Sequence, residues 1–395
     1  MSVAVLNASI FEDTQIAFSH LSNFELRKAY YLYQSFNNPL LLKAGMSLAS
    51  LAFRLHLPVE FIIKATAYRQ FCGGETLKEC AETIGRLAAS GILTALQYSV
   101  ETKAGEADYN KTARELVNAV DFASKNRHVK VICSKLTGLG SFELFEKLHA
   151  NGSPDHEDTK ALERIRERMD LVCSFASKAG VELFFDAEES WIQRPIDMLI
   201  DEMMLRYNKE RAIVYNAFQL YRTDRLDFLK ASYEKTKANN VVLGAKLVRG
   251  AYMEKERQRA KRKGYPSPIY PDKAATDKAY NEALDFCVKN IDGISCCAAT
   301  HNEESCLHLM NLLDTKGIRR NHPHIFFSQL YGMGEHLTYH LAREGFTATK
   351  LVPYGPVREA IPYLIRRAEE NSAITGQAGR ELQMIEKEMK RRGLI

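Results

Sequence analysis

The sequence predicts an α/β protein whose fold is a (β/α)8 barrel of the TIM type. From about residue 90 onward, short apolar runs with the character of strands alternate with longer amphipathic segments. About eight such strand–helix units follow one another over roughly 280 residues, which is the size of this barrel. Repeated units of this kind favour a parallel sheet, and a doubly wound sheet, which is the alternative, would leave spare strands.

The apolar runs give the position of each unit. Strands are expected at residues 92–98, 129–133, 181–185, 212–218, 241–248, 294–299, 324–327 and 348–352. Helices are expected near 108–126, up to about 179, near 192–206 and 224–238, over about 253–290, and after each of the last three strands. Polar side chains that end these strands should therefore meet at one rim of the barrel.

The residues before the first strand have helical patterns only. A Gly73-Gly74 turn precedes Thr76, and Glu79 three residues later completes the signature of a capping box. A last helix, charged on one side, is expected over 378–392. We therefore expect three parts, which are an N-terminal helical arm at 1–90, a barrel catalytic domain at 91–375 and a C-terminal helix at 376–395.

The composition excludes several classes of protein. The chain has 395 residues, of which 46% are hydrophobic, so it can bury a sizeable core. Its 54 Lys and Arg residues nearly balance 49 Asp and Glu residues, and no nucleic-acid partner is expected. The eight cysteines have no C-x-x-C spacing and are expected as reduced thiols of a cytoplasmic protein.

The expected location is the cytoplasm, with peripheral contact at the inner face of the membrane. The N-terminus lacks the basic and apolar segments of a signal peptide. The most apolar window, at 40–63, is interrupted by charged residues and prolines, so soluble or interfacial helices are expected there instead of a spanning helix. The basic run at 254–263 is expected as a solvated helix, with contact to an anionic membrane surface as the alternative.

Polar residues end most of the predicted strands. They are, in chain order, Lys135, Asp186, Gln219, Lys246, Arg249, His301, Asn302, Ser328 and Gln329. Each residue alone suits a helix cap or a salt bridge, but their recurrence at one rim favours a functional site. Cations outnumber carboxylates there, so the ligands are expected to be anionic.

The segment after the last strand carries two adjacent arginines, Arg366 and Arg367, on a predicted helix. Tyr363 and Glu370 lie three residues to either side, so Tyr, Arg and carboxylate groups share one face of the helix. Arginine pairs bidentately with carboxylates, which suits a site for an amino acid or another small acid. The alternative is a solvated charged face.

Metal and nucleotide motifs are weak. His336 and His340 are four residues apart on a likely helical segment but lack a clear third ligand, so no metal is expected. The chain has no G-x-G-x-x-G motif and no P-loop, so a nucleotide would be held by another arrangement.

Several motifs together resemble the proline dehydrogenase family, from about Phe71 to the C-terminus. They are Phe185-Asp-Ala-Glu-Glu, Lys246-Leu-Val-Arg-Gly-Ala-Tyr, Ala299-Thr-His-Asn, Tyr331-Gly-Met-Gly, Pro353-Tyr-Gly-Pro and Pro362-Tyr-Leu-Ile-Arg-Arg. The forms are more similar to the mitochondrial type than to the bifunctional proline utilisation proteins. The resemblance implies an FAD-dependent barrel enzyme of proline catabolism, which oxidises L-proline to 1-pyrroline-5-carboxylate by hydride transfer to flavin N5 and passes electrons to a membrane quinone.

The resemblance also implies roles for single residues. Arg366 and Arg367, together with Lys135, would hold the proline carboxylate, and Asp186 would sit near the amine. Residues expected to pack the ring or close the site are Tyr252, Tyr363, Leu330 and Glu75, the last by pairing with an arginine. Lys246 would act on the flavin. The positions expected around the flavin are Gln219, Lys246, Val248, Gly250, Ala251, Thr300, His301, Asn302 and Gln329, with Arg367 and Glu370 nearby.

One residue departs from the family pattern. Most members have a tyrosine two residues before Pro353, where it bounds the substrate ring near C4, whereas this chain has Leu351. Changes at this position accompany a shift towards 4-hydroxyproline in part of the family. Leucine offers no hydrogen bond to a 4-hydroxyl, so proline or another apolar cyclic amine is expected, with 4-hydroxyproline as the alternative.

Two other classes fit the barrel. A Schiff-base aldolase would use Lys135 or Lys246 at a strand end as its nucleophile. A non-catalytic barrel would serve as a binding scaffold and would hold no flavin.

Overall fold

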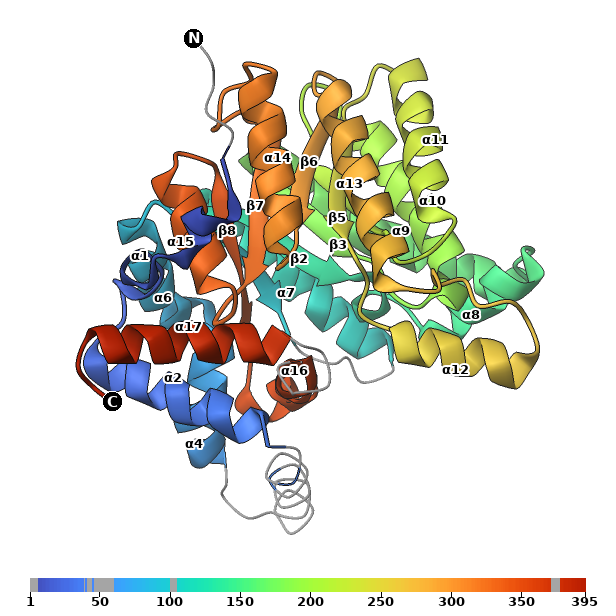
Figure 1. Cartoon of the computed structure of the whole chain (residues 1–395). Helices are drawn as coiled ribbons and strands as arrows, with labels where there is room; N and C mark the ends of the chain where they lie inside the picture. Colours follow the sequence, from blue (N-terminus) through green and yellow to red (C-terminus); the bar gives the residue numbers. More distant parts are fainter. Residues whose placement is uncertain (1–5, 39, 41–44, 46–59, 100–104, 371–376) are drawn as a thin grey trace. The chain divides into compact units, whose positions relative to one another are not determined.

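The computed structural model describes residues 6–38, 40, 45, 60–99, 105–370 and 377–395 (Figure 1). Eight parallel strands form a closed barrel in sequence order, which confirms the predicted (β/α)8 fold. The strands are β1 (Leu93–Tyr98), β2 (Val129–Lys135), β3 (Glu182–Asp186), β4 (Val214–Gln219), β5 (Leu243–Val248), β6 (Ile294–Ala299), β7 (Ile325–Leu330) and β8 (Ala348–Tyr354).

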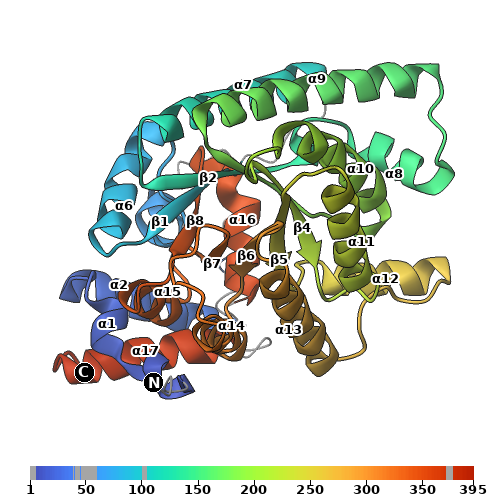
Figure 2. The same cartoon turned by 90° about the horizontal axis from the view of Figure 1, so that it is seen from above.

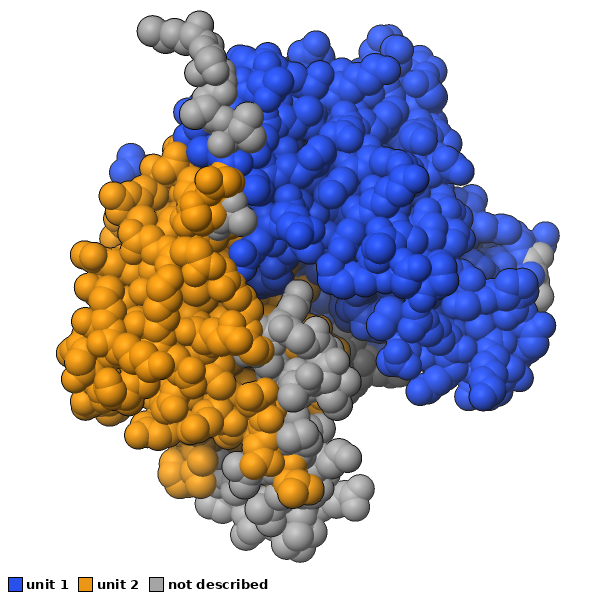
Figure 3. Space-filling model, viewed as in Figure 1, with its two compact units in different colours: residues 1–6, 102–328 blue, residues 7–101, 329–395 orange. Residues whose placement is uncertain are grey.

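The chain divides into two compact units (Figure 3). The first unit is Met1–Leu6 with Thr102–Ser328, and the second unit is Asn7–Glu101 with Gln329–Ile395. The helices of the first unit are α7 (Glu106–Ser124), α8 (Phe142–Asn151), α9 (His156–Ala179), α10 (Ser190–Tyr207), α11 (Arg225–Ala238), α12 (Met253–Lys263), α13 (Lys273–Lys289) and α14 (Glu303–Thr315), with a 3-10 turn η3 (Leu136–Gly138). Helices α7 and α9 run side by side along most of their length (Figure 2).

The second unit joins the N-terminal helices to the C-terminal ones. Its helices are α1 (Thr14–Phe18), α2 (Asn23–Phe36), α4 (Glu60–Ile63), α5 (Arg69–Phe71), α6 (Leu77–Ala89), α15 (Glu335–Arg343), α16 (Val357–Glu370) and α17 (Gln377–Arg391), with a 3-10 turn η1 (Ala8–Glu12) and a π-helical turn η2 (Lys64–Tyr68). Helix α17 packs on α1 and α2 (Figure 1). Burial of apolar side chains holds them together, among them Phe18, Leu26, Tyr33, Phe71, Met384 and Ile385.

Three strands extend two or three residues further than the sequence predicts. β2 continues to Lys135, β7 to Leu330 and β8 to Tyr354. The predicted ends are too early because polar residues at a strand end resemble a loop. The ladder nevertheless continues, since Lys135 is the register partner of Asp186 on β3. Two of the residues expected at the rim, Lys135 and Asp186, are therefore held by regular backbone pairing.

The Gly73-Gly74 turn packs closely against the end of β8 and forms a hydrogen bond with it. Gly73 N–H donates to the Pro353 carbonyl at 2.8 Å, and a side-chain carbon added at Gly73 would lie 2.4 Å from Val352. Only glycine allows this approach.

The helix start that follows differs in detail from the prediction. Thr76 caps α6 as predicted, but the Glu79 carboxylate accepts from the Glu75 N–H at 3.1 Å, one residue before the position of a capping box.

Some predictions remain open. Residues 39, 41–44 and 46–59 of the predicted arm, with most of the apolar window at 40–63, lie outside the described residues. Within the described part of the chain, every helix is too short or too polar to cross a membrane. The three-part division at 1–90, 91–375 and 376–395 stays a prediction.

The buried His340 of α15 should make stability depend on pH. Burial lowers the pKa of His340 below its ordinary value of 6.5. A lowered pKa means stability that is complete above about pH 6.5 and is lost as the pH falls towards the folded-state pKa. We expect His340→Gln to reduce the loss of unfolding free energy between pH 7 and pH 5 by up to about 1.4 kcal/mol per pH unit, measured by urea denaturation. The exposed His156→Gln is the control, and equal slopes in both variants would contradict the prediction.

Candidate active site

A buried ion pair links two strand ends of the first unit. Lys246 on β5 is almost fully buried and pairs with Asp186 at the end of β3. Burial is the largest single effect and would lower the pKa of Lys246, but the attraction and hydrogen bond of Asp186, with smaller effects of Cys133 and Cys297, together raise the pKa. Lys246 is therefore a permanent cation at neutral pH. A Schiff-base nucleophile needs a neutral amine, which disfavours that role for Lys246.

A second cation lies next to a phenol. Lys135, the last residue of β2, donates from Nζ to Tyr252 Oη at 3.1 Å. Burial is the main cause that raises the pKa of Tyr252, so its hydroxyl stays protonated at neutral pH. The structure thus brings together two residues that the sequence placed at separate strand ends.

Tyr252 directly precedes α12, and contacts between α12 and α10 fix the position of this helix. The fully buried Glu256 accepts from both the N–H and the hydroxyl of Ser190, each at 2.6 Å, at the N-terminus of α10. Arg259 lies 4.3 Å from the ring centroid of Trp191. The basic run at 254–263, expected as a solvated helix, is therefore partly buried on one face and carries Tyr252 at its start.

Two of the residues expected around the flavin lie on neighbouring strands of the first unit. Gln219 on β4 is the register partner of Val248 on β5. Gln219 is buried and donates from Nε2 to the Glu188 carbonyl at 2.7 Å. Gly250 has φ 136° and faces the Tyr221 ring, where a side-chain carbon would lie at 2.4 Å.

Polar residues after β6 make hydrogen bonds to neighbouring residues. The Thr300 hydroxyl accepts from Arg249 at 2.6 Å and from the Asn302 N–H at 3.1 Å. The Asn302 side chain caps α14 by accepting from the Ser305 N–H at 2.8 Å. His301, between them, is half-buried. These residues fix the turn after β6.

The double-arginine helix α16 belongs to the second unit. Arg367 is buried, pairs with Glu370 and lies 5.0 Å from the ring centroid of Tyr363. Arg366, its neighbour, is half-buried. The Tyr363 hydroxyl is buried, and it has no hydrogen-bond partner among the described residues. A buried hydroxyl left unpaired costs about 1–3 kcal/mol, so a polar ligand atom would be stabilised there.

Leu351 is buried in the middle of β8, and its direction follows from its neighbour. Lys350 Nζ lies 3.2 Å from Glu335 Oε1 on α15, so Lys350 points towards the helix layer. Successive side chains alternate along a strand, which directs Leu351 to the inner face of the barrel. The structure also pairs Glu75 with Lys64, whereas the sequence predicts a partner arginine.

Two contributions were not predicted from the sequence, and the first is a contact of Glu188, a residue of the Phe185-Asp-Ala-Glu-Glu motif. The buried Glu188 carboxylate accepts from the N–H and the hydroxyl of Thr137 at 3.1 and 2.6 Å, which ties the loop after β2 to the loop after β3. The second is Lys350, a charged residue inside the apolar run of β8. The signal for Lys350 was a lone lysine flanked by strand residues, which is rarely buried without a role.

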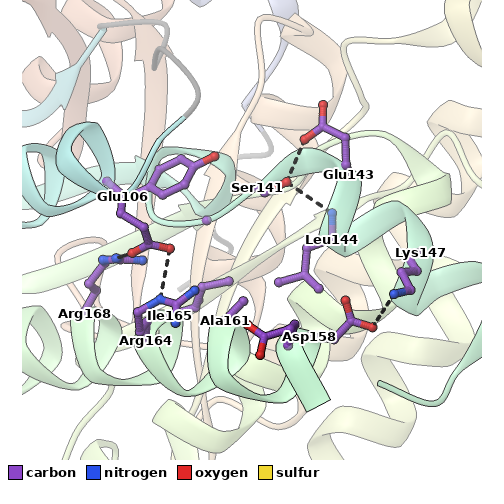
Figure 4. Close-up of a pocket in the computed structure, with 13 residues that line it drawn as sticks. Glu106, Ser141, Glu143, Leu144, Lys147, Asp158, Ala161, Arg164, Ile165 and Arg168 are labelled. Carbon is purple, nitrogen blue, oxygen red and sulfur yellow. Dashed lines mark hydrogen bonds and ion pairs between the residues drawn. The ribbon is translucent and has the colours of Figure 1, made fainter. Parts of the chain in front are cut away.

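Other groups lie outside this set of residues. His336 and His340 are buried within α15. Among the described residues, no group of three His, Cys, Asp or Glu side chains could hold a metal ion. A cavity of about 430 Å³ lies between α7, α8 and α9, lined by none of the predicted site residues (Figure 4). Its charged residues pair with each other, as in Arg164 with Glu106 at 3.0 Å and Lys147 with Asp158 at 2.7 Å.

A closed parallel barrel with polar side chains at the carboxyl ends of its strands is the architecture of a barrel enzyme. A family model described as Proline dehydrogenase matches residues 80–380. The chain therefore belongs to the proline dehydrogenase family and is an oxidoreductase, as the sequence motifs predicted.

Known relatives agree with this assignment. The chain is 33% identical over 382 residues to proline dehydrogenase 1, mitochondrial, of Dictyostelium discoideum, with 86% of this chain and 67% of that protein covered. It is 29% identical over 409 residues to hydroxyproline dehydrogenase of Xenopus laevis, with 94% and 88% covered.

A solved structure supports the fold alone. Proline utilization A (PutA) from Bdellovibrio bacteriovorus, inactivated by N-propargylglycine, superposes with a TM-score of 0.72 at 19% identity. The likeness covers 95% of this chain and 41% of that one, so the chain spans less than half of the larger protein.

Removing the partner of Lys246 should be costly. In Asp186→Asn the buried cation has no carboxylate, and we expect the unfolding free energy to fall by roughly 3–5 kcal/mol, measured by urea denaturation. Asp121→Asn, which breaks the exposed pair with Lys125, should cost less than about 0.5 kcal/mol. The double variant Asp186→Asn with Lys246→Met should recover most of the loss. Equal effects of the two Asp→Asn changes would refute the idea that the buried pair matters.

Proposed function

We propose that this protein oxidises L-proline to 1-pyrroline-5-carboxylate with FAD as its cofactor. The observation that carries the proposal is the buried Lys246–Asp186 pair at the strand ends of a barrel from this family. In the reaction, the ring carbon beside nitrogen loses a hydride and the nitrogen loses a proton, so a C=N bond forms. When bound, FAD supplies the group that accepts the hydride.

The residues present fit a flavin. Gln219 and Thr300 provide an amide and a hydroxyl, Gly250 leaves a stretch of backbone without a side chain, and Lys246 provides a fixed cation. A fixed cation stabilises negative charge that develops on reduction. We propose that FAD is held by Gln219, Lys246, Val248, Gly250, Ala251, Thr300, His301, Asn302 and Gln329, with Arg367 and Glu370 nearby.

The substrate-binding residues follow from the same chemistry. Arg366 and Arg367 provide planar guanidinium groups for the carboxylate, and the Tyr363 hydroxyl, which has no hydrogen-bond partner among the described residues, is a further donor. Lys135 supplies an additional cation, and Asp186 a carboxylate for the amine. The proposed packing residues around the ring are Tyr252, Leu330, Leu351 and Tyr363, and Glu75 is proposed to help close the site.

Leu351 favours proline over 4-hydroxyproline. Its side chain is apolar and points to the inner face of the barrel, so a 4-hydroxyl placed against it would lose hydrogen bonds to water without replacement. The relative named hydroxyproline dehydrogenase keeps 4-hydroxyproline as the second candidate substrate. An aldolase is disfavoured because Lys246 stays charged and Lys135 is bonded to Tyr252.

The electron acceptor is proposed from the sequence resemblance, and the location from the sequence features described above. The acceptor is a membrane quinone, and the protein is cytoplasmic with peripheral contact at the inner face of the membrane. A basic run on α12, including Lys261, Arg262 and Lys263, is consistent with contact to anionic lipid.

Spectroscopy of the purified protein tests the proposal. We expect a flavin band near about 450 nm that bleaches when L-proline is added without oxygen. We also expect a larger kcat/KM for L-proline than for trans-4-hydroxy-L-proline. No band after addition of FAD would refute the cofactor, and a preference for the hydroxylated substrate would refute the reading of Leu351.

Arg366→Ala tests the carboxylate site. Loss of a charge-assisted pair should raise KM for L-proline roughly tenfold to a hundredfold, with flavin content unchanged. Arg358→Ala, an exposed arginine on the same helix, is the matched control and should leave KM unchanged. Similar KM values in the two variants would remove Arg366 from the site.

A further inference from the structure

Lys350 is a buried lysine whose contacts converge on one loop. Its side chain is fully buried in the second unit. Nζ pairs with Glu335 Oε1 at 3.2 Å, donates to the Leu330 carbonyl at 3.3 Å and donates to the Met333 carbonyl. An ammonium group has three donors, and each has an acceptor here.

These three acceptors bracket the loop between β7 and α15, residues 331–334. Leu330 is the last residue of β7, Met333 lies in the loop, and Glu335 is the first residue of α15. One cation therefore joins both ends of the loop. A buried cation is stable only with such partners, so the loop and Lys350 depend on each other.

The rest of the loop is held by the N-terminal helices. The Gly332 carbonyl accepts from Tyr33 Oη of α2 and from Gln70 Nε2 of α5, the latter at 3.2 Å. Gly332 has φ 78°, and a side-chain carbon there would lie 2.0 Å from the Gln70 carbonyl oxygen. The loop can therefore follow this path only with glycine at 332.

The C-terminal helix also contacts the loop. Glu381 of α17 accepts from the Gly334 N–H, and the Glu381 side chain is buried. On α15, Thr338 donates from Oγ1 to Gln329 Oε1 at 2.9 Å, which fixes the side-chain amide of Gln329.

We propose that Lys350 is a positioning residue for the reaction, and that the N-terminal helices and α17 serve the same purpose. The loop begins directly after Gln329 and Leu330, which the proposed function assigns to FAD and to the substrate ring. The inference rests on that proposed function. It gives the helical arm a role, which is to hold these two residues in place through the backbone of the loop.

The test compares Lys350→Met with a matched lysine. Hydrogen exchange of the loop amides should be at least tenfold faster in Lys350→Met than in the wild-type protein. The Kd for FAD should rise at least tenfold, and kcat at saturating FAD and proline should fall at least fivefold. Lys130→Met is the control, because Lys130 pairs with Glu182 in the first unit at 2.5 Å. It should change stability, with loop exchange and FAD affinity within twofold of wild type.

Tyr33→Phe decides the case if Lys350→Met does not fold. It removes a single hydrogen bond to the Gly332 carbonyl and keeps the ring, and it should weaken FAD binding about threefold to fivefold while loop exchange accelerates. Wild-type exchange and FAD affinity in Tyr33→Phe, or in a folded Lys350→Met, would overturn the inference. A wild-type protein without flavin would instead refute the proposed function, while the exchange of the loop would still show whether Lys350 holds it.

Discussion

A lysine inside a barrel strand must have a carboxylate within reach, and the pair of Lys246 with Asp186 is the constraint on which the rim of the first unit depends. β5 and β3 are separated by β4, so the pair holds strand ends that are not neighbours. Gln219 on β4 donates to the Glu188 carbonyl, and the Glu188 carboxylate holds Thr137 after β2. These contacts thus connect the polar ends of four strands, and they compensate the charges that this end of the barrel carries.

The second unit also contains a buried lysine, Lys350, whose charge must be compensated by other acceptors. Lys350 pairs with Glu335 and donates hydrogen bonds to two backbone carbonyls. All of its donors therefore hold the loop at 331–334. Lys246 has one carboxylate partner among the described residues, Asp186, and its raised pKa keeps it cationic at the rim. The two buried lysines thus differ in their acceptors, which is why we propose a role in the reaction for Lys246 and a positioning role for Lys350.

The sequence predicted the strands and most helices within a few residues, because hydrophobic periodicity reports which face of an element is buried. It placed the rim residues correctly at strand ends, since a parallel barrel puts all those ends on one side. The sequence did not predict which residues form hydrogen bonds or ion pairs with each other. Glu188 and Thr137 are 51 residues apart, and Ser190 and Glu256 are 66 apart, so only the folded chain brings them together. Glu75 shows the same limit, because its observed partner is Lys64 and the motif suggested an arginine.

The position of Leu351 is fixed by its neighbours as much as by its own packing. The Tyr331 N–H donates to the Leu351 carbonyl at 2.9 Å, and Lys350 anchors the adjacent residue to the start of α15. The backbone of β8 therefore has little freedom to move when the side chain at 351 changes. The family resemblance implies a tyrosine at this position, and we propose that Leu351 in its place changes the volume and polarity of the inner face of the barrel more than the path of the strand. Under the proposed function, substrate selection at this position would depend on one side chain, carried by a backbone that the contacts of Lys350 hold in place.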